Sequence, residues 1–378
     1  MRVMHVIGGL GVGGAEMMLL KLLTAGRDSN WEALVVSLST RGPMGARIAE
    51  LGIPVYGLGL RRNLRGVTVV PAALVALAWR FRPNLVQGWM YEGNLAASLA
   101  GVSHPRRSPV LWNMRQTIHD IAATERPTIV AAIRLGARLS RHPAAIIYNS
   151  ERSAEQHEAF GYRADHRVLI PNGFDTDMFR PSPEARSRIR EGLGIAQDAI
   201  LVGLVARYHP MKDHRAFLLA AASLVRNYPT LYFVLAGTGV SEEAPELSEI
   251  MAEHQLSGRV FLLGERADVP EVTAALDIAC SASWGEGFSN AIGEAMACGV
   301  PCVVTDVGDS ARIVADTGVI VVPRDPQALA SGIARLIEAG ASGRSSLGLA
   351  ARRRVEAEYS LPAITRRYHE LYDAHAIR

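Results

Sequence analysis

Lysine is almost absent from this sequence. Of the 40 Lys and Arg residues among 378, only Lys21 and Lys212 are lysine, so nearly every cation is an arginine. Cysteine is scarce as well. Cys280, Cys298 and Cys302 are odd in number and lack the paired spacing of a zinc site, which excludes a disulfide framework and favours a reducing cytosol.

Long apolar runs and charged tails are also missing. The longest apolar run, residues 67–79, contains Pro71 and is about 13 residues long, whereas a membrane span needs roughly 20. Residues 3–7 are followed at once by glycines, which is typical of a buried strand entering a turn and not of a secretory signal. No Lys/Arg-rich tail suggests a nucleic-acid partner. We therefore expect a cytoplasmic protein, either free or peripheral at the inner membrane face.

The sequence does contain the pattern of an α/β protein with two domains. Its 378 residues exceed the roughly 250–300 at which a single core stops growing. Strands apolar on both faces belong to parallel sheets covered by helices, so we predict two Rossmann-like, doubly wound domains, residues 1–175 and 176–360. The predicted strands are residues 3–7, 33–38, 55–58, 85–87, 110–112, 145–148 and 168–170 and, after a Pro/Asp/Gly-rich linker at 171–183, residues 200–205, 231–235, 260–263, 278–280, 302–305 and 319–322. A last helix is expected from Pro362.

The charge is divided unevenly between these halves. Residues 1–175 hold 20 cations and 12 anions, a net charge of +8, and the remaining residues hold 20 and 25, a net charge of −5. This predicts either an ordinary solvated surface or a basic face toward an anionic membrane or a phosphorylated acceptor. The arginines that flank the apolar run are Arg61, Arg62, Arg65, Arg80, Arg82, Arg106 and Arg107.

Gly9, Gly11 and Gly14 match the dinucleotide-binding fingerprint between a strand and a helix. The acidic residue that would hold a ribose after the second strand is missing, because residues 39–41 are Ser, Thr and Arg. A nicotinamide enzyme is therefore disfavoured, although Arg41 could still hold a 2′-phosphate. A loop near another phosphate or sugar, or a simple tight turn, stays open. Glu16 is expected in the first turn of the following helix.

Asp175 and Asp177 form an Asp-x-Asp pair, which could hold a divalent cation between nucleotide phosphates. The pair lies in the predicted linker, where turn chemistry explains it better, so we predict no metal.

Glu286 and Glu294 flank the segment 287–290, which precedes a helical stretch at residues 291–297. Ser289 or Asn290 can cap this helix, and its first-turn amides form an anion site. On one helix the two carboxylates would lie about 12 Å apart, beyond the roughly 5–9.5 Å of glycosidase pairs, so recognition of hydroxyl groups suits them better.

Arg207 and Lys212 follow the predicted strand at residues 200–205, where open α/β sheets bind ligands. A chain that otherwise uses arginine has a lysine here, which favours a compact, mobile charge. Two such cations would neutralise a departing diphosphate, and the alternative is an ordinary surface charge.

Two further loops have open interpretations. His119 could position an acceptor or shuttle a proton, or simply lie at the surface. Trp89, Met90 and Tyr91 could floor a sugar pocket or pack in the core. His209 and His214 are expected to be structural.

Together these residues resemble the retaining GT-B glycosyltransferases of family four, the glycosyl transferases group 1, and especially those of bacterial polysaccharide assembly. The motifs that carry the resemblance are GGLGVGGAE, NGFDTDMFRP, VARYHPMKDH, LAGTG, LLGERADVP and GEGFSNAIGEAMACGVPCVVTDVG. The resemblance implies an acceptor-side first domain, with residues 361–378 crossing back to it, and a nucleotide-sugar-binding second domain across a cleft.

The resemblance also implies roles for individual residues. Arg207 and Lys212 would bind the donor diphosphate, Glu294 the ribose and Glu286 the hydroxyls of the transferred sugar. The segment from Gly287 through Phe288 to Ser289 and Asn290 would lend backbone contacts, as would Gly13, Gly14 and Gly237, with Arg266 and Val269 at the base. Arg207, Lys212, Glu286 and His119 are the predicted catalytic residues. No metal, cofactor or enzymatic nucleophile is implied.

We therefore predict a hexosyltransferase that uses a UDP- or GDP-linked sugar, retains the anomeric configuration and acts on a saccharide or lipid-linked acceptor. The alternatives are a GT-B-type nucleotide-sugar epimerase, an NAD(P)-dependent Rossmann enzyme, and a non-catalytic partner of another transferase.

Overall fold

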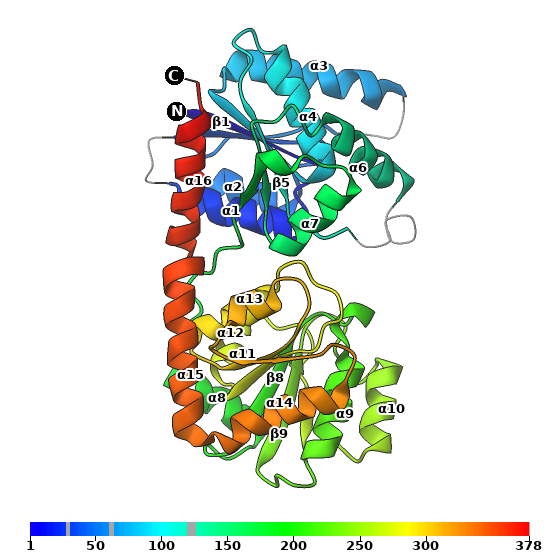
Figure 1. Ribbon diagram of the computed structural model, residues 1–378, viewed down its shortest axis with the longest axis vertical. Helices are drawn as coiled ribbons and strands as arrows, with labels where there is room; N and C mark the ends of the chain where they lie inside the picture. Colours follow the sequence, from blue (N-terminus) through cyan, green and yellow to red (C-terminus); the bar gives the residue numbers. More distant parts are fainter. Residues whose placement is uncertain (28–30, 60–63, 119–125, 378) are drawn as a thin grey trace. The chain divides into compact units, whose positions relative to one another are not determined.

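The computed structural model describes residues 1–27, 31–59, 64–118 and 126–377. The chain divides into two compact units, here called unit 1, which comprises Met1–Gly173 and Leu361–Arg378, and unit 2, which is Phe174–Ser360 (Figure 1). Each unit is a parallel sheet covered by helices on both faces. The acceptor-side and donor-side roles of the two domains stay predictions.

Unit 1 contains a seven-stranded sheet in the order β3-β2-β1-β4-β5-β6-β7, and every neighbouring pair is parallel. The order reverses between β1 and β4, so the predicted doubly wound topology is confirmed. The strands are β1 (Arg2–Ile7), β2 (Glu32–Ser37), β3 (Val55–Gly57), β4 (Leu85–Trp89), β5 (Val110–Met114), β6 (Ala145–Tyr148) and β7 (Arg167–Leu169).

Two apolar clusters cover the two faces of this sheet. One face packs against α1 (Gly14–Ala25), α2 (Gly42–Glu50) and α16 (Leu361–His375). The other packs against α3 (Leu64–Phe81), α4 (Met90–Ser103), α6 (Pro127–Leu139) and α7 (Glu151–Phe160), and η1 (Ala164–His166) precedes β7. Within the described ranges, no helix is both long and apolar enough to cross a bilayer.

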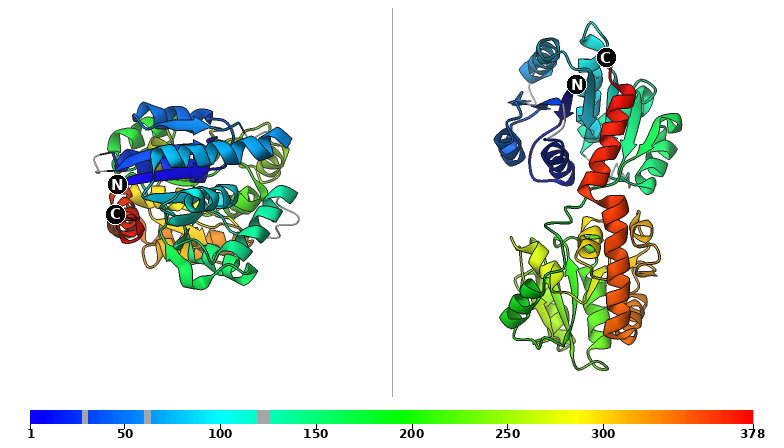
Figure 2. Two further views of the ribbon diagram at one scale, coloured as in Figure 1. Left: turned by 90° about the horizontal axis from the view of Figure 1, so that it is seen from above. Right: turned by 90° about the vertical axis from the view of Figure 1, so that its left-hand side faces the viewer.

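The predicted last helix is confirmed as α16, which lies against unit 1 (Figure 2). Its Ile364, Tyr368 and Tyr372 are completely buried in the core of that unit. The Tyr372 hydroxyl donates to Gln87 on β4, and the Tyr368 hydroxyl accepts from Asn113 Nδ2 on β5 at 2.9 Å. The helix is therefore an integral part of unit 1, although the whole of unit 2 precedes it in sequence.

Unit 2 contains a six-stranded parallel sheet in the order β10-β9-β8-β11-β12-β13. The order reverses between β8 and β11, which gives a second doubly wound sheet. The strands are β8 (Ile200–Val205), β9 (Leu231–Ala236), β10 (Val260–Leu262), β11 (Ile278–Ser281), β12 (Cys302–Thr305) and β13 (Val319–Val321).

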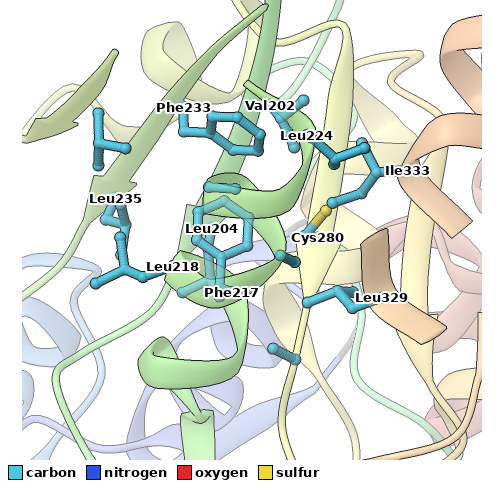
Figure 3. Close-up of a cluster of buried hydrophobic side chains, with 14 of the residues drawn as sticks. Val202, Leu204, Phe217, Leu218, Leu224, Phe233, Leu235, Cys280, Leu329 and Ile333 are labelled. Atoms are coloured by element: carbon cyan, nitrogen blue, oxygen red, sulfur yellow. The ribbon is translucent and has the colours of Figure 1, made fainter. Parts of the chain in front are cut away.

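The core of unit 2 lies on both sides of this sheet. Figure 3 shows Phe217 of α9 packed with Phe233 and Leu235 of β9, and the two phenyl rings meet edge to face with centroids 5.6 Å apart. The helices are α8 (Pro183–Leu193), α9 (His214–Leu224), α10 (Pro245–Glu253), α11 (Val269–Ala274), α12 (Asn290–Ala297), α13 (Ser310–Val314), α14 (Pro326–Glu338) and α15 (Gly340–Arg354), with η2 (Pro210–Lys212) and η3 (Val355–Tyr359) as short helical turns.

The predicted linker contains a turn built on Asp175. One Asp175 carboxylate oxygen accepts from the amides of Asp177 and Met178 at 3.1 and 2.9 Å. This is the turn chemistry expected from the sequence. Just before the turn, the Phe174 amide donates to the Tyr359 carbonyl at 2.8 Å, so the two ends of unit 2 lie side by side.

Candidate functional site

Two loops meet where the strand order of unit 2 reverses. β8 and β11 are parallel neighbours, with Val202 opposite Ile278, so the loops that follow them emerge at the same edge of the sheet. Residues 206–213 form the first loop, with Arg207 and Lys212, and residues 282–289 form the second, with Glu286. In open α/β sheets this reversal point is where ligands bind.

Lys212 and Glu286 form an ion pair across these loops. Their side chains are 24% and 13% exposed, so the pair is partly shielded from water. Ser283 Oγ donates to the same Glu286 oxygen at 2.9 Å. The residues predicted to hold the diphosphate and the sugar hydroxyls are therefore bound to each other.

Trp284 joins the same two loops by a second route. Its backbone amide donates to the Met211 carbonyl at 3.0 Å, and its indole Nε1 donates to the Pro210 carbonyl at 2.8 Å. The Arg324 guanidinium lies over its ring, 4.4 Å from the centroid. Sequence reasoning missed Trp284 and Ser283, and their position two and three residues before Glu286 was the available signal.

The backbone turns sharply after Lys212. Asp213 has a left-handed conformation, with φ 51° and ψ 52°, and its carboxylate accepts from the Ala216 amide at 3.1 Å to begin α9. His209 Nδ1 accepts from the Met211 amide at 3.2 Å. Burial lowers the pKa of His209, and the Arg207 and Lys212 cations lower it further. Both cations thus act on one small region, and the Arg207 side chain is exposed there.

The helix predicted beyond Glu286 is confirmed as α12, but its predicted side-chain cap is wrong. Asn290 is already the first helical residue, and Ser289 stands at the cap position without a side-chain hydrogen bond to the helix. The Ser289 hydroxyl therefore does not occupy the first-turn amides, as a bound phosphate could do. Glu294 lies within α12 and Glu286 before it, so the two carboxylates do not share a helix.

Other predicted donor residues of unit 2 have structural contacts. The Phe288 ring is buried and stacks on Phe174 with centroids 6.1 Å apart, whereas the Gly287 carbonyl accepts from the Asp309 amide at 3.1 Å. Gly237 has φ +153°, and a Cβ there would overlap the backbone carbonyl of Ala206, so two loops approach closely at this glycine.

Arg266 and Val269 lie together at the start of α11. The Arg266 guanidinium donates to both carboxylate oxygens of Asp268 at 2.7 and 2.5 Å, and these hydrogen bonds lower the pKa of Asp268. Val269 is the first residue of α11. The predicted base-binding role of both residues stays a prediction.

In unit 1, Gly13 and Gly14 form the start of α1. Gly13 is extended and stands at the cap position, Gly14 is the first helical residue, and Glu16 occupies the first turn as predicted. Burial raises the pKa of Glu16. The Arg41 side chain donates through Nε to the Val55 carbonyl at 2.8 Å, so the structure gives it a backbone partner in place of a 2′-phosphate.

The aromatic residues at the end of β4 and the start of α4 pack in the core. Trp89 is completely buried, stacks on Tyr368 and donates through Nε1 to His5 at 3.3 Å. Tyr91 is buried, with its hydroxyl 3.1 Å from His157 Nε2. The packing interpretation therefore applies to both, and they do not floor a sugar pocket. His119 lies outside the described residues.

Two family models match the chain. The glycosyl transferase 4-like domain matches residues 13–173, and the model described as glycosyl transferases group 1 matches residues 199–339, so together they cover well over half of the sequence.

Individual proteins agree with these matches. The lipopolysaccharide core biosynthesis mannosyltransferase LpsB of Rhizobium meliloti is 29% identical over 53% of this chain and 57% of its own length. An Escherichia coli UDP-Gal:alpha-D-GlcNAc-diphosphoundecaprenol alpha-1,3-galactosyltransferase is 32% identical over 37% of this chain and 36% of its own length. These matches thus span about a third to three fifths of the curated relatives.

A solved structure is similar over the whole chain. Anabaena HepE in complex with UDP has a TM-score of 0.85 and 25% identity, with 99% of this chain and 100% of that chain covered. The same protein has also been solved with UDP-glucose. The predicted fold, a pair of doubly wound domains of the GT-B type, is confirmed by this likeness.

Proposed function

Because this chain belongs to the group 1 glycosyltransferases, we propose that it transfers a hexose from a nucleotide-diphosphate sugar to a saccharide or lipid-linked acceptor in glycan assembly. The observation that carries this proposal is the Lys212–Glu286 ion pair at the strand reversal of unit 2, beside the start of α12. It brings together a cation for phosphate and a carboxylate for hydroxyl groups, the two chemistries that a nucleotide sugar needs.

The comparisons support a uridine donor. HepE binds UDP and UDP-glucose, and the Escherichia coli relative uses UDP-galactose on a diphosphoundecaprenol-linked sugar. We favour a UDP-hexose, with a GDP-hexose as the alternative. A lipid-linked acceptor presents its sugar at the inner face of the membrane, so the proposed place of work is the cytoplasmic side, free or peripheral.

In the proposed reaction, positive charges of unit 2 stabilise the leaving diphosphate. The bond between the anomeric carbon and the phosphate oxygen breaks, and the acceptor hydroxyl oxygen bonds to that carbon from the same face, which retains the configuration. Arg207, Lys212 and the amides at the start of α12 would stabilise the diphosphate as its charge develops. The acceptor proton leaves with the diphosphate oxygen.

Glu286 and Glu294 would orient the donor. When the diphosphate pairs with Lys212 in place of Glu286, the Glu286 carboxylate becomes available to accept hydrogen bonds from the sugar hydroxyls. Glu294 would hold the ribose. The two cations supply the charge that a metal supplies in other transferases, so we propose a metal-independent reaction.

The test is transfer by purified variants with UDP-hexoses and oligosaccharide acceptors. Lys212→Ala and Glu294→Ala should each fold normally and lose turnover by about 10²–10³-fold, the effect of removing one preorganised group. Lys21→Ala, at the only other lysine, should retain it. Near-native turnover in Lys212→Ala would refute the assignment.

The product of the wild-type reaction tests the remaining points. Nuclear magnetic resonance of the new linkage should show the donor's anomeric configuration, and added chelator should leave the rate unchanged. Release of nucleotide diphosphate with an altered free sugar, and no acceptor product, would indicate an epimerase instead.

A further inference from the structure

Helix α3 is apolar on two opposite faces. Its inward residues, buried in the core of unit 1, are Val70, Leu74 and Ala78. Exposed apolar residues recur on its outward face at spacings of three and four, and these are Val69, Ala72, Ala76 and Trp79. A surface helix of a globular protein normally carries polar residues outward, so this face needs a partner other than water.

Helix α4 extends the same apolar surface. Val69 and Trp79 on α3 are 59% and 54% exposed, and Leu99 and Val102 on α4 are 39% and 66% exposed. Trp79 connects the helices, since its Nε1 donates to the Ser103 carbonyl at 2.9 Å. A shallow hollow between α3 and α4 is lined by apolar side chains and Arg80; Figure 1 shows the two helices. We call the set Val69, Ala72, Ala76, Trp79, Leu99 and Val102 the α3–α4 face.

Arginines lie near the C-terminal ends of α3 and α4, and in the described part of the chain none of them forms a salt bridge to an acidic residue. Between Glu50 and Asp120 the sequence holds eight arginines and a single acidic residue, Glu92. The exposed arginines in the described part of this stretch are Arg80, Arg82, Arg106 and Arg107. Burial lowers the pKa of His104, and the positive charges of Arg106, Arg82 and Arg2 lower it further. The described charges at this end of the α3–α4 face are therefore positive.

Other helices of unit 1 differ from α3 and α4. On α7 the outward positions include Arg152 and Glu155, which form an ion pair at 3.5 Å. On α6 the exposed Leu135 stands between exposed Arg134 and Arg138. Uncharged outward surface is thus a property of the α3–α4 face and not of the whole unit.

We propose that the α3–α4 face docks on a bilayer that contains anionic lipids. Apolar side chains with a tryptophan suit the boundary between head groups and acyl chains, where helices lie in the plane of the membrane. The arginines at one end of the face match anionic head groups, whose negative charge attracts basic segments beside a membrane. This docking gives a physical basis to the peripheral position proposed above.

Vesicle flotation of the full chain tests the proposal. The wild type should float with vesicles of phosphatidylcholine and phosphatidylglycerol, and float much less with phosphatidylcholine alone or at high salt. Val69→Asp/Val102→Asp should bind on the order of tenfold more weakly because it charges the apolar surface, and Arg106→Glu/Arg107→Glu should lose a similar amount because it repels the lipid.

Matched controls lie on α6 of the same unit. Leu135→Asp charges an exposed apolar position, as each Val→Asp change does, and Arg134→Glu/Arg138→Glu reverses two charges, as Arg106→Glu/Arg107→Glu does. Both controls should float like the wild type. All variants should retain the wild-type unfolding midpoint and transfer to a soluble acceptor without vesicles, which separates failure of docking from failure of the proposed function. Absent flotation of the wild type, equal losses in the α6 controls, or a dimer in solution that Val69→Asp/Val102→Asp dissociates would each overturn the proposal.

Discussion

Glu286 forms an ion pair with Lys212, and this pair leads to a counterintuitive prediction for Glu286→Gln. The glutamine amide oxygen can still accept the hydrogen bond from Ser283 Oγ, so the loop should keep its shape. The negative charge that competes with a diphosphate for Lys212 is removed. We expect this variant to bind UDP more tightly than the wild type while it transfers sugar more slowly, because a neutral amide is a weaker acceptor for sugar hydroxyls.

The size of the gain follows from the geometry of the pair. Two unit charges about 4 Å apart attract by about 4 kcal/mol at an effective dielectric constant of about 20. The Lys212 and Glu286 side chains are 24% and 13% exposed. Because removing these charges from water costs part of the attraction, the net interaction energy is about 1–2 kcal/mol. The dissociation constant for UDP should therefore fall by about 5- to 30-fold.

Isothermal titration with UDP measures this change, and a double-mutant cycle assigns it. The gain from Glu286→Gln should vanish in a Lys212→Ala background, since no cation is then released. Glu249→Gln on α10, at an exposed glutamate of the same unit, should leave UDP binding unchanged. Weaker UDP binding by Glu286→Gln, or the same gain with and without Lys212, would show that competition for the lysine is not the cause.

Two further predictions concern stability. Gly237→Ala should lower the free energy of unfolding by at least about 2 kcal/mol in urea titrations, because of its φ and the overlap with Ala206, whereas Gly192→Ala, with nothing near its Cβ, should not destabilise. Burial lowers the pKa of His157 from 6.5 to about 4. Its contribution to the free energy of unfolding is therefore complete above about pH 6.5 and is lost as the pH falls toward 4, with a loss of about 2 kcal/mol by pH 5. His157→Gln should abolish that part of the pH dependence and exposed His142→Gln should not; an unchanged pH dependence in His157→Gln would contradict this.

Much of the fold could be predicted because buried parallel strands are continuous apolar runs. Each predicted strand has a counterpart, and no strand boundary differs by more than two residues. The Lys212–Glu286 pair could not be predicted, because the two residues lie 74 positions apart. Their contact depends on β11 pairing with β8 after the chain has passed through β9 and β10 on the other side.

The same holds for the candidate site: what depends on nearby sequence could be predicted, and what depends on contacts with distant residues could not. Loop positions were predictable, because motifs after strands fall at the carboxyl edge of a parallel sheet. Side-chain partners were not. Trp89 ends β4 at the edge of the sheet where ligands bind, yet Tyr368 of α16 stacks on it. The Arg41 side chain donates to the Val55 carbonyl on a neighbouring strand.

The division of unit 1 into two stretches has a consequence for synthesis of the chain. Unit 2 is continuous in sequence, and its ends are joined by the Phe174–Tyr359 hydrogen bond, so it can close as soon as residue 360 has left the ribosome. Unit 1 lacks Ile364, Tyr368 and Tyr372 until then, and its sheet has an unfilled core opposite α1. The usual order, in which the first domain folds first, should therefore be reversed in part, with unit 1 completed last.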